Sequence, residues 1–128
     1  MVSTVLKILI DLAKSPRIVL DKEEALRLLT EYAVLKKSRD LEEAIRIVRN
    51  FTEYLGYSRR KFEEYINVPK DPGDALRGRV VVHRIRLFMD GAREMVEIVF
   101  DRRINIDELV SILKKMGFTE VVIEEQRI

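Results

Sequence analysis

The sequence predicts an α+β protein with a helical N-terminal half of about four helices, followed by a β-β-α-β unit that forms a small mixed sheet. In the first half of the chain, apolar side chains recur at helical spacing, whereas from Arg79 onwards they recur at every second residue. Helix caps and turn residues mark where most elements begin and end. The length of 128 residues suits a single domain, 1–128, with a helical region over residues 1–67, a loop over 68–78 and a β-β-α-β region over 79–128.

Residues 3–14 are predicted to form the first helix, because they are apolar except for a narrow stripe of Lys7, Asp11 and Lys14. Pro16 is expected to end this helix. A helix that is apolar on most sides has to be buried, either within its own chain or against a second copy. We expect a homo-oligomer, since assembly is a frequent means of stabilisation in thermophiles.

Two capping boxes, Asp21-Lys-Glu-Glu24 and Asp40-Leu-Glu-Glu43, predict where the second and third helices begin. Gly56 is expected to end the third helix, and Ser58 to cap a short fourth one. The segment from Asn67 to Gly78 contains prolines and glycines at several positions and is predicted to be a loop.

A β-hairpin is predicted where Asp90-Gly91 separates two runs of alternating apolar residues. A two-residue turn at this position sets Ile85 opposite Val96 and Arg84 opposite Glu97, and it places His83 on the inward, apolar face. After the hairpin, Asn105 caps a last helix that Gly117 ends, and Thr119 to Glu124 form a third strand.

The outward face of this hairpin is the first candidate site, because it combines arginines with Phe88 and flat apolar groups. Guanidinium groups pair with phosphates or stack on bases, and an aromatic ring offers a base a stacking platform. We therefore expect single-stranded nucleic acid to bind there through Arg77, Arg79, Arg84, Arg86, Phe88 and Arg93. The alternatives are that the N-terminal helices cover this face, or that it contacts a partner protein as a structural or adaptor domain.

The predicted fourth helix is a second candidate, because a glycine stop, a serine cap and a short basic helix together resemble a helix-turn-helix. Its Arg59, Arg60 and Lys61 would extend a phosphate path, or would contact duplex DNA if the protein were a regulator. Any two consecutive helices, however, need a similar stop and cap.

Composition and charge restrict the remaining classes of function. The net charge is only +2, so a surface that binds a polyanion has to be a local patch. Without cysteine and with His83 as the one histidine, we expect no metal and no cofactor, and no pattern of catalytic residues points to an enzyme. The 36% of charged residues with few amides predicts a hyperthermophilic, archaeal source, and no apolar stretch is long enough for a membrane span, so we expect a cytoplasmic protein.

In size, composition and layout the chain resembles the ThermoDBP-related single-stranded DNA-binding proteins of archaea. The layout in question is a helical segment, Asp21 to Gly56, joined to a small sheet that contains Arg79-Val-Val-Val-His-Arg-Ile-Arg-Leu-Phe-Met89. The resemblance covers most of the chain but contains no motif that assigns a role to a single residue. It implies single-stranded DNA binding with little sequence preference, and assembly through a surface other than the long C-terminal zipper of some members, which this chain lacks.

Overall fold

The N-terminal segment forms strands β1 (Val5–Ile10) and β2 (Pro16–Asp21) in the computed structural model, which describes residues 5–11, 14–56 and 63–125. The prediction of a helix over residues 3–14, and with it a helical N-terminal half, is therefore wrong. Leu6 and Ile8 are buried while Val5 is exposed, so the pattern repeats every second residue. In so apolar a segment, spacings of 2 and of 3.6 fit equally well, and partner strands distant in sequence decide between them.

Helices occupy the middle of the chain, and strands dominate its two ends. After β2 come α1 (Lys22–Leu35), α2 (Arg39–Arg49), α3 (Phe51–Gly56), β3 (Glu63–Asn67), α4 (Pro72–Leu76), β4 (Val82–Asp90), β5 (Arg93–Phe100), α5 (Ile106–Lys115) and β6 (Glu120–Glu125). The structure is therefore α+β, and β4, β5, α5 and β6 follow the predicted β-β-α-β order. None of the helices in the described ranges is long and apolar enough to cross a bilayer.

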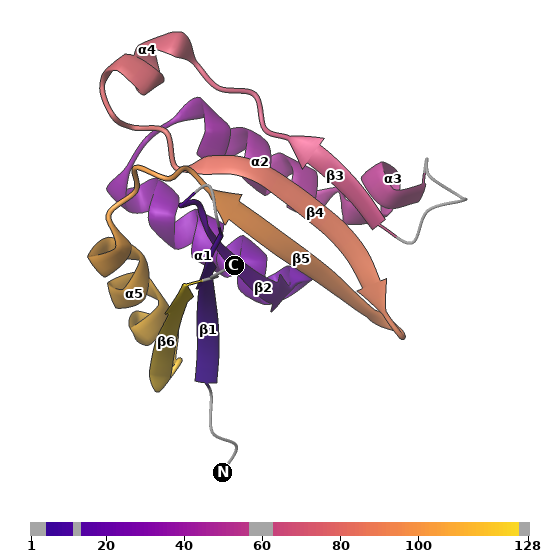
Figure 1. The fold of residues 1–128 in the computed structure, drawn as a ribbon. Coiled ribbons are helices and arrows are strands. Elements are labelled where there is room, and N and C mark those ends of the chain that lie inside the picture. Colours follow the sequence, from indigo (N-terminus) through magenta and orange to yellow (C-terminus); the bar gives the residue numbers. More distant parts are fainter. Residues whose placement is uncertain (1–4, 12–13, 57–62, 126–128) are drawn as a thin grey trace.

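The described strands form one six-stranded mixed sheet in the order β3-β4-β5-β2-β1-β6. Strand β6 pairs with β1 in parallel, and every other neighbouring pair is antiparallel. Helices α1 and α2 lie side by side across one face of this sheet (Figure 1). Between them and the strands lies the core, which includes Leu29, Val48, Ile85 and Ile98.

Strands β1 and β2 bury their apolar residues in this core. The reason for expecting an oligomer, an apolar helix that needs a partner, therefore no longer applies. Leu6, Ile8, Ile18 and Leu20 are all less than a tenth exposed within a single chain. Homo-oligomerisation stays a prediction, but it no longer follows from an apolar helix.

The capping predictions for the second and last helices are confirmed. Asp21 accepts a hydrogen bond from the backbone N–H of Glu24, and the Glu24 side chain accepts one from the Asp21 N–H, which completes a capping box. Asn105 accepts from the N–H groups of Asp107 and Glu108 at the start of α5. By contrast, Asp40 is not the cap of α2: Ser38 holds the N-cap position, and Asp40 lies within the first turn.

From Arg84 onwards the hairpin has the predicted faces, but its register differs from the predicted one by two residues. The central turn residues are Gly91 and Ala92, and Asp90 pairs with Arg93. Gly91 has a φ of +61°, which a glycine at the first turn position accommodates without strain. A shift of two residues leaves each side chain on the same face, but Glu97 now lies opposite Arg86 instead of Arg84.

The hairpin also contains an irregularity at His83, because the pairing shifts between Val82 and Arg84. The extra residue leaves the regular alternation, and His83 is exposed and not inward-facing as predicted. Two further predictions are wrong: residues 63–67 are a strand and not part of a fourth helix, and the expected loop contains the short helix α4, whose cap is Asp71.

Candidate nucleic-acid interface

The side of the sheet opposite α1 and α2 carries the candidate site. On β4, Ile85 and Leu87 point into the core, so the alternating residues Arg84, Arg86 and Phe88 point to the other side. Pairing across the sheet continues this surface onto β3, β5 and β2. We call it the open face, and it consists of Tyr65, Arg84, Arg86, Phe88, Arg93, Met95, Glu97, Val99, Arg17 and Val19.

A cluster of two rings and two guanidinium groups lies on the open face. The guanidinium carbon of Arg84 lies 5.1 Å from the centre of the Tyr65 ring. That of Arg86 lies 4.1 Å from the centre of the Phe88 ring and 6.0 Å from that of Tyr65. These distances are typical of cation–π contacts, which hold the long arginine side chains against the rings. Tyr65 is 51% exposed, so a portion of its ring is free for a ligand.

The cations of the cluster differ in how far their charge is neutralised within the chain. Arg86 faces Glu97, with Nε 3.4 Å from Oε1 and Nη2 3.4 Å from Oε2, and both side chains are less than a fifth exposed. Arg84 forms no ion pair with any residue that the structure describes. At the hairpin end, Arg93 lies 3.7 Å from the Asp21 carboxylate and is 65% exposed. Arg84 and Arg93 are therefore the better placed to bind an anion from solvent.

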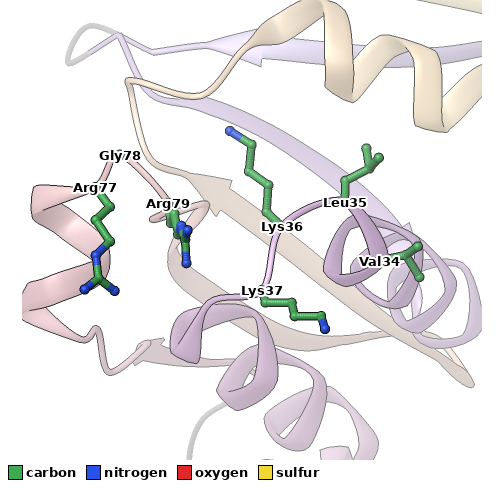
Figure 2. Close-up of a pocket in the computed structure, with 7 residues that line it drawn as sticks. All are labelled: Val34, Leu35, Lys36, Lys37, Arg77, Gly78 and Arg79. Atoms are coloured by element: carbon green, nitrogen blue, oxygen red, sulfur yellow. The ribbon is translucent and has the colours of Figure 1, made fainter.

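The predicted site residues separate into three groups. Arg84, Arg86 and Phe88 lie together, with Arg93 on the same face. Arg77 and Arg79 lie elsewhere, in the connection between α4 and β4, where they line a pocket with Lys36 and Lys37 (Figure 2). The predicted basic cluster Arg59, Arg60 and Lys61 lies outside the described residues.

The residues of the open face that lie outside the predicted hairpin, Tyr65, Arg17 and Val19, were not predicted. Tyr65 reaches the face because β3 pairs with β4 and sets Tyr65 beside Arg86, and Arg17 does so because β2 pairs with β5. Tyr65 and Ile66 are residue types that favour strands, but a run of five residues is too short for its periodicity to exclude a helix.

His83 precedes Arg84 on β4 and is in contact with Lys70. The Lys70 Nζ is 2.8 Å from His83 Nδ1, a geometry in which the ammonium donates to a neutral imidazole. Partial burial lowers the pKa of His83, and the charges of Lys70 and Arg84 lower that pKa further. In the described portion of the chain, no group of three or more His, Asp or Glu side chains has the arrangement of a metal site.

Comparison with protein-family models, with curated protein sequences and with solved structures found no match to this chain. The resemblance to the ThermoDBP-related proteins therefore stays a prediction from layout.

Proposed function

We propose that this protein binds single-stranded nucleic acid, with DNA as the expected ligand, without enzymatic activity and with little sequence preference. The observation that carries the proposal is the cluster of Tyr65, Arg84, Arg86 and Phe88 on the open face. Exposed rings stack on bases of any sequence, and the guanidinium groups beside them attract the phosphates between those bases.

The residues that would contact the ligand differ in their expected roles. Tyr65 stacks on a base, because half of its surface is open to solvent. Arg84 and Arg93 neutralise phosphates, since Arg84 has no counter-ion among the described residues and Arg93 has only a long contact to Asp21. Arg86 chiefly holds the Phe88 ring in place, because Glu97 already occupies its guanidinium.

The test is fluorescence anisotropy with labelled single-stranded and double-stranded oligonucleotides at several salt concentrations. We expect single strands to bind more tightly, and the affinity to fall with salt at a log–log slope of about −1.4, which corresponds to the two phosphates neutralised by Arg84 and Arg93. A lack of binding at low salt contradicts the proposal, and a preference for duplex contradicts its claim of single-strand selectivity. The same titration with a labelled oligo-U strand compares the affinity for RNA with that for DNA.

Two variants and a matched control test the open face itself. Tyr65→Leu should weaken binding by about 1–3 kcal/mol through the lost stacking. Arg84→Gln should make the salt slope shallower by about 0.7. Arg49→Gln removes an exposed arginine from the end of α2, on the helical side, and should leave binding unchanged. If both open-face variants bind as the wild-type does, the ligand uses another surface.

A further inference from the structure

A basic pocket lies on the helical side of the sheet, away from the open face. It forms where the connection between α1 and α2 faces the connection between α4 and β4 (Figure 2). Its volume is about 410 Å³, within the range of small-molecule sites. The residues that line this basic pocket are Val34, Leu35, Lys36, Lys37, Arg77, Gly78 and Arg79.

Four of these seven residues carry a positive charge and none carries a negative one. Only Lys36 has a counter-ion among the described residues, since its Nζ lies 3.5 Å from an oxygen of Glu108 on α5. Lys37, Arg77 and Arg79 form no ion pair within the described ranges. Positively charged side chains this close together repel one another and attract anions from solution.

The two arginines are arranged to act on one anion together. Their side chains leave the backbone on either side of Gly78 and run in the same direction (Figure 2). Gly78 has a φ of +67°, a left-handed conformation that other residues adopt only with strain. Guanidinium groups are planar forks that bind phosphate oxygens in pairs, so Arg77 and Arg79 suit a ligand with phosphate groups. The Lys37 side chain points another way in Figure 2, but its flexible stem can reach the same ligand.

The ligand should also have an apolar portion. Leu35 is 59% and Val34 is 76% exposed, and both line the pocket, while Leu76, which directly precedes Arg77, is 91% exposed. An inorganic anion gains nothing from these side chains, whereas a nucleobase can lie against them. A peptide would call for a longer groove than the two short connections provide.

We propose that the basic pocket binds a nucleotide, with its phosphate groups on Arg77 and Arg79 and its base against Leu35 and Val34. The nucleotide has two conceivable sources, a free nucleoside polyphosphate or the phosphorylated end of a strand. This nucleotide site is separate from the proposed single-strand site, because the two lie on opposite sides of the sheet and share no residue.

The experiment is isothermal titration calorimetry at low salt with adenosine triphosphate, pyrophosphate and adenosine as probes. We expect adenosine triphosphate to bind more tightly than either fragment. The double variant Arg77→Gln/Arg79→Gln should lower the affinity for adenosine triphosphate at least tenfold, since two charge-assisted contacts are lost. Leu35→Ser should lower the affinity for adenosine triphosphate severalfold and leave the affinity for pyrophosphate unchanged. Arg49→Gln is again the matched control.

Several outcomes overturn this inference. They are the absence of adenosine triphosphate binding, equal binding by the double variant, and pyrophosphate binding as tight as that of the nucleotide. Tighter binding of an acidic, leucine-containing peptide would assign the pocket to a protein partner instead. All changed residues are exposed, so thermal melting should confirm that each variant is folded.

A competition experiment separates the two sources of the nucleotide. If strand ends are the natural ligand, a 5′-phosphorylated oligonucleotide should displace adenosine triphosphate, and an unphosphorylated one should not. If the free nucleotide is the ligand, neither should displace it. An Arg84→Gln variant that binds single strands with a shallower salt slope but keeps the wild-type affinity for adenosine triphosphate separates the two sites, so that either proposal can fail without the other.

Discussion

The carboxylate of Asp40 accepts a hydrogen bond of 2.7 Å from the backbone N–H of Val82, 42 residues further along the chain. The same oxygen accepts a second bond, of 2.8 Å, from the N–H of Val81, and the Asp40 side chain is fully buried. The first turn of α2 is thereby fixed to the start of β4, the strand that carries the candidate interface.

Replacing Asp40 by alanine should lower the free energy of unfolding by about 2–4 kcal/mol, because two buried N–H groups lose their acceptor. Asp40→Asn keeps an acceptor oxygen of similar shape and should lose less than half as much. Equilibrium unfolding in urea measures both values. An alanine variant as stable as the wild-type would mean that other acceptors replace the carboxylate.

The hydroxyl of Tyr32 should contribute nothing to stability. Its oxygen is buried and has no hydrogen-bond partner among the described residues, while its ring packs near that of Phe100. We expect Tyr32→Phe to be as stable as the wild-type or more stable by up to about 1 kcal/mol, since a buried polar group without a partner is removed. Thermal and urea unfolding test this, and a clear loss of stability would reveal a partner for the hydroxyl.

Alkaline pH gives an independent test at the same residue. Burial, with a further effect of Glu108, raises the pKa of Tyr32 to about 12, so the folded state disfavours the tyrosinate. Ionisation of this group therefore leaves the free energy of unfolding unchanged below pH 10 and lowers it as the pH rises towards 12. The difference in free energy of unfolding between Tyr32→Phe and the wild-type should therefore change between pH 10 and pH 12. Because the folded wild-type holds the Tyr32 proton more tightly than its unfolded chain does, the wild-type should lose more stability than the variant over this range.

The features of the fold that were predictable have local signals. The Asp21 capping box and the Asn105 cap depend on side chains within three residues of the bonds they form, so the sequence contains the whole interaction. The faces of the hairpin from Arg84 onwards follow from alternation alone, whereas the irregularity at His83 does not. The register of the hairpin does not either, because Asp90-Gly91 and Gly91-Ala92 are both acceptable turn centres, and the first is the commoner choice.

The features that were not predictable depend on distant partners. Residues 5–10 are apolar on both sides, and their strand is specified by β6 at the other end of the chain and by β2. Asp40 has the sequence position of a cap, yet its carboxylate serves β4. The same applies to the site: alternation predicted Arg84, Arg86 and Phe88, whereas Tyr65 joins them only through the pairing of β3 with β4.

Acidic pH should destabilise the protein through His83. The pKa of His83 is lowered from its ordinary value of 6.5, so the folded state disfavours the protonated ring. The stabilising contribution of the neutral His83 ring is complete above pH 6.5 and is lost as the pH falls below 6.5. Around the ring, Lys70 and Arg84 oppose protonation, and Asp101 and Asp11 favour it to a smaller extent.

The measurement is the urea midpoint of the wild-type and of His83→Gln between pH 7.5 and pH 5.5. Carboxylates titrate similarly in both proteins, so the difference between the two reports His83. We expect the wild-type to lose more stability than the variant on acidification. Equal losses would mean that the folded protein does not disfavour the protonated ring.

Removing Glu97 should strengthen the proposed binding of nucleic acid. Its carboxylate occupies the guanidinium of Arg86 and adds a negative charge to the face where phosphates would lie. In Glu97→Gln, the open face loses the negative charge beside Arg86, so the single-strand affinity should rise at low salt and the salt slope should steepen by about 0.7. Glu53→Gln removes an exposed carboxylate from α3, away from the open face, and should leave the slope unchanged. A Glu97→Gln variant that stays folded yet binds single strands no better would show that Arg86 does not face the ligand.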